Sequence, residues 1–266
     1  MLLSAGIAHQ AMVNGATLPV AREVALPIKG LPQIWDGVRI VHLTDIHANT
    51  FTSFDWMRAI VAIANSLTPD VIAITGDLAD DPVDELAPIV SPLADLSAPY
   101  GCFFVTGNHE YYTAARGVET WIGHLRDLGF DVLLNEHRVI KRSNGTLLLG
   151  GVTDYHAGFN MPAHASSPSA AIKNASTVDI KILLAHQPKS IYEAADAGFD
   201  IQLSGHTHGG QLFPGNLLMA IAQPFVYGMH RYRDTQIYVS SGAGSWGPKA
   251  RMGSTAEIAA IVLSSA

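Results

Sequence analysis

Apolar positions follow two different periods along this chain, and the change of period distinguishes expected strands from expected helices. Three short runs are apolar at nearly every position: 38–43, 71–75 and 102–106. Continuous runs of this kind, rich in β-branched or aromatic residues, are typical of strands buried on both faces of a sheet. The segments that follow each run repeat their apolar residues at three- and four-residue intervals, which predicts helices with one buried face. These segments are 54–65, 83–96 and 117–128, the second broken by Pro88 and Pro92.

Alternating strands and helices in the first half indicate a parallel sheet joined by helical crossovers. The second half has mainly short strands, and Asn144-Gly145 supplies a hairpin turn. The strands expected there are 132–134, 137–141, 146–150, 180–185, 201–204, 236–240 and 256–263, with a helix at 188–197. No change of composition separates the halves. The pattern therefore favours an α/β class fold in which one domain contains two stacked sheets, with helices outside.

Two segments do not follow these periods. Residues 1–35 read as an irregular or edge-strand lead-in, because three prolines interrupt them, and the single domain is expected at 36–266. Residues 157–177 are rich in Ala, Ser and Pro, which predicts an exposed insertion that could act as a lid. The apolar start at 1–8 is too short for a membrane span and lacks the basic start of a signal peptide. It is also compatible with the tail of a longer hydrophobic segment, so that the chain would be a fragment of a membrane-anchored protein.

Composition narrows the function classes. Apolar residues make up 48% of the 266 positions and charged residues only 15%, with a formal net charge of −7 and no cluster of Lys and Arg. This balance argues against nucleic acid as the main partner. The apolar excess indicates either a large core or an exposed patch that meets lipid, and 219–227 is the candidate patch, although a buried segment is the favoured reading there. The single Cys102 excludes an internal disulfide and is expected to be a buried, inert thiol.

Metal-binding residue types recur in five blocks in one order. The blocks are Asp45-Ile-His47, Gly76-Asp77-Leu-Ala-Asp80, Gly107-Asn108-His109-Glu110, the lone His186, and Gly205-His206-Thr-His208. Carboxylates, amide oxygens and neutral imidazoles are the usual ligands of hard and borderline divalent cations. Four blocks follow predicted strands directly, and the carboxyl ends of parallel strands meet at one edge of a sheet. The sequence therefore predicts a shared metal site at that edge, with Asp77 on the middle strand as the candidate bridge between two ions.

Each block has an ordinary explanation when taken alone. Asp45 could cap a helix, Asp77 and Asp80 could be turn residues, and Asn108 could hold a left-handed turn. A lone histidine such as His186 is more often packed or solvated than a ligand. All five blocks in one order are poorly explained in this way, and His206 and His208 would face the same side of an extended segment.

The ordered blocks resemble those of the calcineurin-like metallophosphoesterases over residues 38 to about 210. The resemblance implies a four-layer α/β/β/α sandwich with mixed sheets, the metallophosphatase fold. It implies a binuclear centre of two divalent metal ions, drawn from Mn²⁺, Fe, Zn²⁺ or Mg²⁺. One ion would take Asp45, His47, Asp77 and His208. The other would take Asp77, Asn108, His186 and His206.

The same resemblance implies catalytic roles for His109 and Asp80. His109 would contact the phosphate and stabilise charge or protonate the leaving oxygen, and Asp80 would orient His109. Asn108 would also contact the substrate. A metal-bridging hydroxide would be the nucleophile in hydrolysis of a phosphodiester or pyrophosphate P–O bond. Glu110 is expected to support its loop rather than to bind metal.

A narrower resemblance is to bacterial membrane-associated phosphoesterases, some of which hydrolyse the pyrophosphate of UDP-diacylglucosamine. It rests on Gly205-His-Thr-His-Gly-Gly-Gln211, Gly107-Asn-His-Glu-Tyr-Tyr112, Tyr227-Gly-Met-His-Arg-Tyr232 and Ser240-Ser-Gly-Ala-Gly-Ser-Trp-Gly-Pro248. This likeness implies a lipid-precursor pyrophosphohydrolase as an alternative, in the bacterial cytoplasm or peripheral to the membrane. A catalytically silent scaffold that binds a protein partner is the alternative from another class.

Several other residues have open roles at this stage. His156, His230 and Arg231 are candidates for substrate contact. Lys249 and Arg251 are as compatible with solvated surface charges as with substrate contact. Trp246 either lines the cleft or merely packs against neighbouring residues. The sequence leaves the oligomeric state open.

Overall fold

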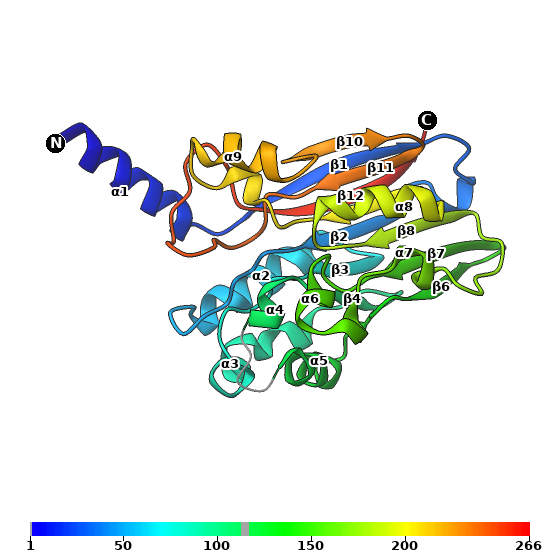
Figure 1. Cartoon of the computed structure of the whole chain (residues 1–266), viewed down its shortest axis with the longest axis horizontal. Coiled ribbons are helices and arrows are strands. Elements are labelled where there is room, and N and C mark those ends of the chain that lie inside the picture. Colours follow the sequence, from blue (N-terminus) through cyan, green and yellow to red (C-terminus); the bar gives the residue numbers. More distant parts are fainter. Residues whose placement is uncertain (1, 113–116) are drawn as a thin grey trace.

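Two six-stranded sheets stack face to face in the computed structural model, which describes residues 2–112 and 117–266 (Figure 1). The first sheet has the order β1 (Val20–Ile28), β12 (Glu257–Ser265), β2 (Arg39–Leu43), β3 (Val71–Thr75), β4 (Cys102–Val105), β5 (Asp131–Val132). The second has the order β10 (Gly228–Tyr232), β11 (Thr235–Val239), β9 (Ile201–Ser204), β8 (Ile180–Leu184), β7 (Gly145–Gly151), β6 (Glu136–Arg142).

Both sheets are mixed. The predicted parallel order β2, β3, β4 is present, and β12 joins it antiparallel to β2. In the second sheet β7, β8, β9 and β11 are parallel, whereas β6 and β10 pair antiparallel at the two edges. The expected α/β sandwich with mixed sheets is therefore confirmed.

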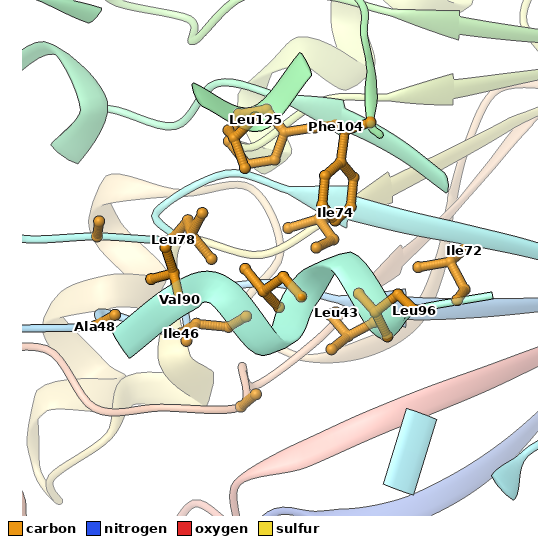
Figure 2. Packing of buried hydrophobic residues seen from close by; sticks show 14 of the residues in the cluster. Leu43, Ile46, Ala48, Ile72, Ile74, Leu78, Val90, Leu96, Phe104 and Leu125 are labelled. Carbon is orange, nitrogen blue, oxygen red and sulfur yellow. The ribbon is translucent and has the colours of Figure 1, made fainter. Parts of the chain in front are cut away.

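Strand β3 shows why these residues form buried strands. Ile72 and Ile74 face the helices outside the first sheet, whereas Val71 and Ala73 face the second sheet, so both faces need apolar residues. The outer cluster, part of which Figure 2 shows, packs the sheet against three amphipathic helices. They are α2 (Phe54–Ser66), α3 (Val83–Val90) and α5 (Val118–Asp127).

The second sheet has its own helical cover. Ala171 and Ala194 pack on Leu148 and Leu183 of β7 and β8, and they come from α7 (Pro168–Ala171) and α8 (Ile191–Ala197). The layers are thus helices, sheet, sheet, helices. Short helical turns complete the described chain: α4 (His109–Tyr112), α6 (Ala157–Asn160) and 3₁₀ turns at Gln33–Trp35, Ser91–Asp95, Pro162–His164, Pro188–Ser190 and His208–Gly210.

Three segments differ from the sequence expectations. Residues Leu2–Ala16 form helix α1 rather than an irregular lead-in, and β1 follows as an edge strand of the first sheet. Helices α6 and α7 lie within 157–177, where Ala157, Pro168 and Ala171 are buried, so this segment is only partly exposed. The candidate patch begins within α9 (Gly215–Ala222), which has no buried residue, so the favoured reading of a buried segment is wrong for this helix. Among the described residues, no helix combines the length and apolar character that crossing a bilayer requires.

Candidate metal centre

The five sequence blocks come together where the carboxyl ends of both sheets meet. Asp45 and His47 follow β2, Asp77 follows β3, and Asn108 follows β4 in the first sheet. His186 follows β8 in the second sheet, and two more histidines, His206 and His208, follow β9. Because all these strands run parallel within their sheets, their ends supply side chains to one small region.

The first group of candidate ligands is Asp45, His47 and His208. One ligand atom from each lies within 4.8 Å of the others, and all three residues are buried. The Nε2 atoms of His47 and His208 are 3.0 Å apart, and Asp45 Oδ1 is 3.4 Å from His208 Nε2. Two imidazole nitrogens that face each other at this distance suit ligation of one cation, because both lone pairs can point at a shared centre.

The second group is Asp77, His186 and His206, again within 4.8 Å of one another. His186 Nε2 lies 3.2 Å from Asp77 Oδ2 and 3.1 Å from His206 Nδ1. Asn108 adds an amide oxygen, because its Oδ1 is 3.2 Å from His186 Nε2. Two imidazoles, a carboxylate and an amide oxygen form the mixed N and O set that borderline divalent metals accept.

Asp77 lies between the two groups. Its Oδ2 atom is 3.2 Å from His186 Nε2 and 3.7 Å from His47 Nε2. The Oδ1 atom of the same carboxylate accepts a hydrogen bond of 2.9 Å from the His109 backbone N–H, which fixes its orientation. This placement fits a carboxylate shared by two ions.

Backbone strain concentrates at these positions. Five candidate ligands have positive φ angles between 47° and 69°: Asp45, His47, Asp77, His206 and His208. Non-glycine residues rarely adopt such angles, and strained backbone is typical of functional sites. His206 and His208 therefore lie in a turn rather than in the extended segment expected from the sequence, yet both reach the cluster.

Two glycines keep the cluster compact. A Cβ atom at Gly107 would overlap the carboxylate of Asp77, and one at Gly205 would overlap that of Asp45. Only glycine leaves room for the strand ends to approach the carboxylates this closely.

Hydrogen bonds fix which nitrogen of each imidazole is free. His47 Nδ1 lies 2.7 Å from Asp80 Oδ1, and His186 Nδ1 lies 2.7 Å from the Thr75 carbonyl oxygen. Since both partners only accept, each Nδ1 carries a proton, so the lone pair of the neutral imidazole is on Nε2, which faces the other candidate ligands. His109 Nδ1 also lies 2.8 Å from Asp80 Oδ1, so Asp80 holds two histidines at once.

Glu110 supports the loops around the centre, as expected. Its carboxylate accepts hydrogen bonds from the backbone N–H groups of Asp77 at 3.1 Å, Leu78 at 2.8 Å and Gly107 at 2.6 Å. Burial, with the neighbouring Asp77 charge, raises the pKa of Glu110 to about 7. The buried carboxylate ties the ends of β3 and β4 together.

The protonation states of several candidate ligands suit a cation: His206 and His208 are neutral, and Asp77 is ionised. Burial lowers the pKa of His206 to about 3 and holds the pKa of His208 well below its usual value, so both imidazoles are neutral near pH 7. Burial opposes ionisation of Asp77, but neighbouring histidines, His186 first, hold its pKa well below the usual range. His186 is the exception: burial lowers its pKa, yet the Asp77 and Asp45 carboxylates raise it to about 10. A cation must displace that proton.

A cavity of about 620 Å³ opens above the cluster. Its floor contains His47, Asp77, Asn108, His109, His206 and His208. The rest of its lining is largely apolar or aromatic and includes Tyr112, Leu212, Leu218, Met219, Trp246 and Pro248. Trp246 therefore walls the cleft, which was one of its two expected roles.

The structure does not bring all candidate substrate residues to this cavity. His156 lies beside the centre, where its Nδ1 is 3.1 Å from Gln187 Nε2 and its ring stacks on Phe159. His230 stacks on Phe225 and hydrogen-bonds the Tyr227 carbonyl at 2.8 Å. Arg231 is exposed on β10 and pairs with Gln236 at the start of β11, away from the strand end that adjoins the centre. None of these three lines the cavity.

Arg251 is the residue whose environment the sequence did not reveal. It is 1% exposed, so the reading of a solvated surface charge is wrong. Its guanidinium donates to the carbonyls of Ser241 and Gly244 and lies 3.4 Å from His208 Nδ1. Burial lowers the pKa of Arg251 to about 10. The Gly- and Ser-rich segment 240–254 supplies the carbonyls that the guanidinium binds, but no local pattern in it marks Arg251 as buried.

Comparison with known proteins now gives the family. The family model described as Calcineurin-like phosphoesterase matches residues 38–210. This chain belongs to that family. The match ends shortly after His208, so it spans all five ligand blocks, whereas α1, β1, α9 and the last strands lie outside it.

Relatives of this calcineurin-like phosphoesterase include longer proteins. The chain is 37% identical over its whole length to a zebrafish (Danio rerio) protein named "Transmembrane protein with metallophosphoesterase domain", of which it covers 62%. It is 38% identical to an "Uncharacterized metallophosphoesterase" of Helicobacter pylori strain J99, with 94% of the chain and 65% of that protein aligned. The chain thus spans about three fifths of the length of these curated relatives.

A solved structure supports the fold assignment. The crystal structure of a 5'-nucleotidase precursor from Thermus thermophilus superposes with a TM-score of 0.52 at 14% identity. The superposition covers 85% of this chain and 54% of the other. At this identity the likeness concerns the fold alone.

Proposed function

We propose that this calcineurin-like phosphoesterase is a binuclear metal-dependent hydrolase of phosphodiester or pyrophosphate P–O bonds. The observation that carries the proposal is the position of Asp77, whose carboxylate faces His47 of the first ligand group and His186 of the second. One buried carboxylate between two groups of imidazoles suits a pair of adjacent divalent cations, because a carboxylate can be shared by both ions.

Eight ligand positions would serve the two ions, with Asp77 counted in both sets. Asp45, His47, Asp77 and His208 would hold one ion, and Asp77, Asn108, His186 and His206 the other. When bound, two such cations offset the charge of phosphoryl oxygens and lower the pKa of water to about 7. Mn²⁺, Fe, Zn²⁺ and Mg²⁺ all suit this mixed donor set.

His109 has the position and charge of a proton donor. Its ring lines the cavity, and its Nδ1 is held by Asp80, which leaves Nε2 directed away from that carboxylate. Burial lowers its pKa, but Asp80, Asp77 and Glu110 raise the pKa above its ordinary value. A protonated imidazole can stabilise the phosphoryl charge and donate to the leaving oxygen.

A lipid-precursor pyrophosphate, of the UDP-diacylglucosamine type, is the second candidate substrate. The apolar part of the cavity lining favours it, because Leu212, Leu218 and Met219 line the same space as the candidate metal ligands. A small water-soluble diester would leave that part of the lining exposed to water. A screen of monoesters, diesters and nucleotide-lipid pyrophosphates, with each metal in turn, separates these candidates. Absence of turnover with every metal would favour the scaffold alternative.

Replacement of the shared carboxylate tests the hydrolase directly. Asp77→Asn should abolish hydrolysis of bis-p-nitrophenyl phosphate, because the neutral amide is a poor bridge between two cations. The matched control is Asp234→Asn, on an exposed turn between β10 and β11, which should keep the wild-type rate. If Asp77→Asn retains more than about a tenth of that rate, the bridging role is excluded.

A further inference from the structure

Residues 2–21 carry no Asp, Glu, Lys or Arg, and neither do residues 209–229. At the average of 15% charged residues, segments of this combined length would carry about six. The first contains α1, and the second contains α9 and the loops on either side of it. Charge is therefore excluded from two regions that are far apart in sequence.

The two segments lie against each other in space. A cavity of about 430 Å³ is lined by Ala8, Ala11 and Met12 of α1 together with Leu212 and Phe213 from the α9 segment. Hydrogen bonds fix the end of α1 nearest the domain, because the Arg251 backbone N–H donates to the Ala11 carbonyl at 2.8 Å. Figure 1 shows α1 projecting away from the sheets on the side where α9 lies. We call residues 8–21 and 209–229 together the charge-free surface.

Large apolar side chains on this surface are open to solvent. Ile221 is 85% exposed, Leu218 71%, Met12 62%, and Leu217 and Phe213 both 59%. Contiguous exposed apolar groups are unfavourable in water and mark surfaces that bind another apolar phase.

We propose that the charge-free surface docks onto a lipid bilayer, with α9 lying in the boundary between headgroups and acyl chains. A helix that lies flat at a membrane surface buries its apolar side chains at the boundary between headgroups and acyl chains. The proposal goes beyond the hydrolase activity, since docking needs neither metal nor turnover.

The apolar residues that α9 contributes to the catalytic cavity favour a bilayer over a second copy of this chain. Leu218 belongs both to the outer surface of α9 and to the wall of the 620 Å³ cavity above the metal ligands. A bilayer on α9 would therefore bring acyl chains next to the apolar residues Leu212, Leu218 and Met219 that line this cavity, which the folded surface of a second copy does not offer.

The charge pattern predicts which lipids suffice. The two segments have no Lys or Arg to attract anionic headgroups, the exposed Lys249 beside Gly15 donates to the Phe51 carbonyl, and the chain has a net charge of −7. Docking should therefore rest on apolar insertion, so that it occurs on neutral phosphatidylcholine and persists in high salt. Docking by a basic patch would show the opposite dependence.

The test is flotation of the protein with phosphatidylcholine vesicles at low salt and at about 1 M salt, where charge interactions are screened. The wild type should float equally in both. In the double variant Leu217→Gln and Ile221→Gln, the partition coefficient should fall by about tenfold for each side chain, the scale of burying one large aliphatic group. Neither residue lines the catalytic cavity, and glutamine keeps the helix propensity, so hydrolysis of a soluble phosphodiester should be unchanged.

The matched control is Tyr192→Gln on α8, which removes a 45% exposed aromatic outside the charge-free surface and should float like the wild type. Three results would overturn the proposal. They are wild-type protein that does not float, flotation that requires anionic lipid or disappears in salt, and a wild-type dimer that the double variant dissociates. The last would assign the surface to self-association. Hydrolysis of the soluble substrate is measured separately, so failure of docking is distinct from failure of the hydrolase.

Discussion

Asp80 controls more of the centre than its place in the sequence indicates. The prediction from the sequence was one role, orienting His109, whereas in the structure one Oδ1 atom accepts from both His47 and His109. Burial alone would raise the pKa of Asp80, but hydrogen bonds from the two histidines outweigh this effect and lower the pKa to about 2. The carboxylate is thus ionised at every working pH, and it links a candidate metal ligand to the candidate proton donor.

Asp80→Asn should therefore weaken metal binding as well as turnover. An amide of the same size cannot accept from both imidazoles as a charged oxygen does, so His47 loses its fixed tautomer. Metal affinity should fall by about 10–100-fold, the usual effect of losing such an outer partner.

By contrast, His109→Ala should keep both ions and lower turnover by roughly 10²–10⁴. Metal titration followed by turnover at saturating metal distinguishes the two variants. An Asp80→Asn protein that binds both ions like the wild type would contradict the role of Asp80 in metal binding through His47.

The proton on His186 makes metal binding depend on pH. With its pKa near 10 in the ion-free protein, this histidine is protonated at neutral pH, and its interactions stabilise the ion-free fold fully below its ordinary pKa of 6.5. That contribution is lost as the pH rises through about 10. A cation bound at Nε2 expels the proton, so affinity should rise by up to about tenfold per pH unit between about pH 7 and 9. Calorimetry in two buffers of different ionisation enthalpy should detect about one released proton. Affinity that is flat over this range would contradict the assignment.

At the scale of elements, the sequence predicted the strands and helices that have a regular spacing of apolar residues. Strands such as β3 need apolar residues on both faces, so their runs are visible without tertiary information. The ligand blocks were recognisable for the same reason, since each directly follows such a strand.

Elements that depend on distant partners were missed. Helix α1 is apolar without a polar face, so it has no helical period to detect, and its attachment comes from Arg251, which lies 240 positions after Ala11. The burial of Arg251 could not be predicted either, because its carbonyl partners belong to a loop whose path the last strands determine. The turn at His206 and His208 was read as extended for a similar reason: its positive φ angles are imposed by the cluster around it.

At the scale of the molecule, the centre joins the two halves of the sandwich. Asp45, Asp77 and Asn108 come from the first sheet, and the histidines at 186, 206 and 208 come from the second. Ions held by both sets would cross-link the sheets at the edge where their strands end. Without ions, the buried carboxylates are only partly balanced by neighbouring positive charge. Burial therefore raises the pKa of Asp45 above its usual value.

Removal of metal should therefore destabilise the whole domain rather than the site alone. Each ion present at about 1,000 times its dissociation constant stabilises the folded state by about 4 kcal/mol, and chelation removes that contribution. For a domain of this size the loss of each ion corresponds to a fall in Tm of roughly 10 °C. Scanning calorimetry should show Tm falling with EDTA and recovering when Mn²⁺ is added. The Tm of Asp77→Asn should change far less in both steps. Equal melting of the wild type with and without chelator would mean that the ligands hold no ion across the sheets, because an ion that binds only the folded state cannot leave Tm unchanged.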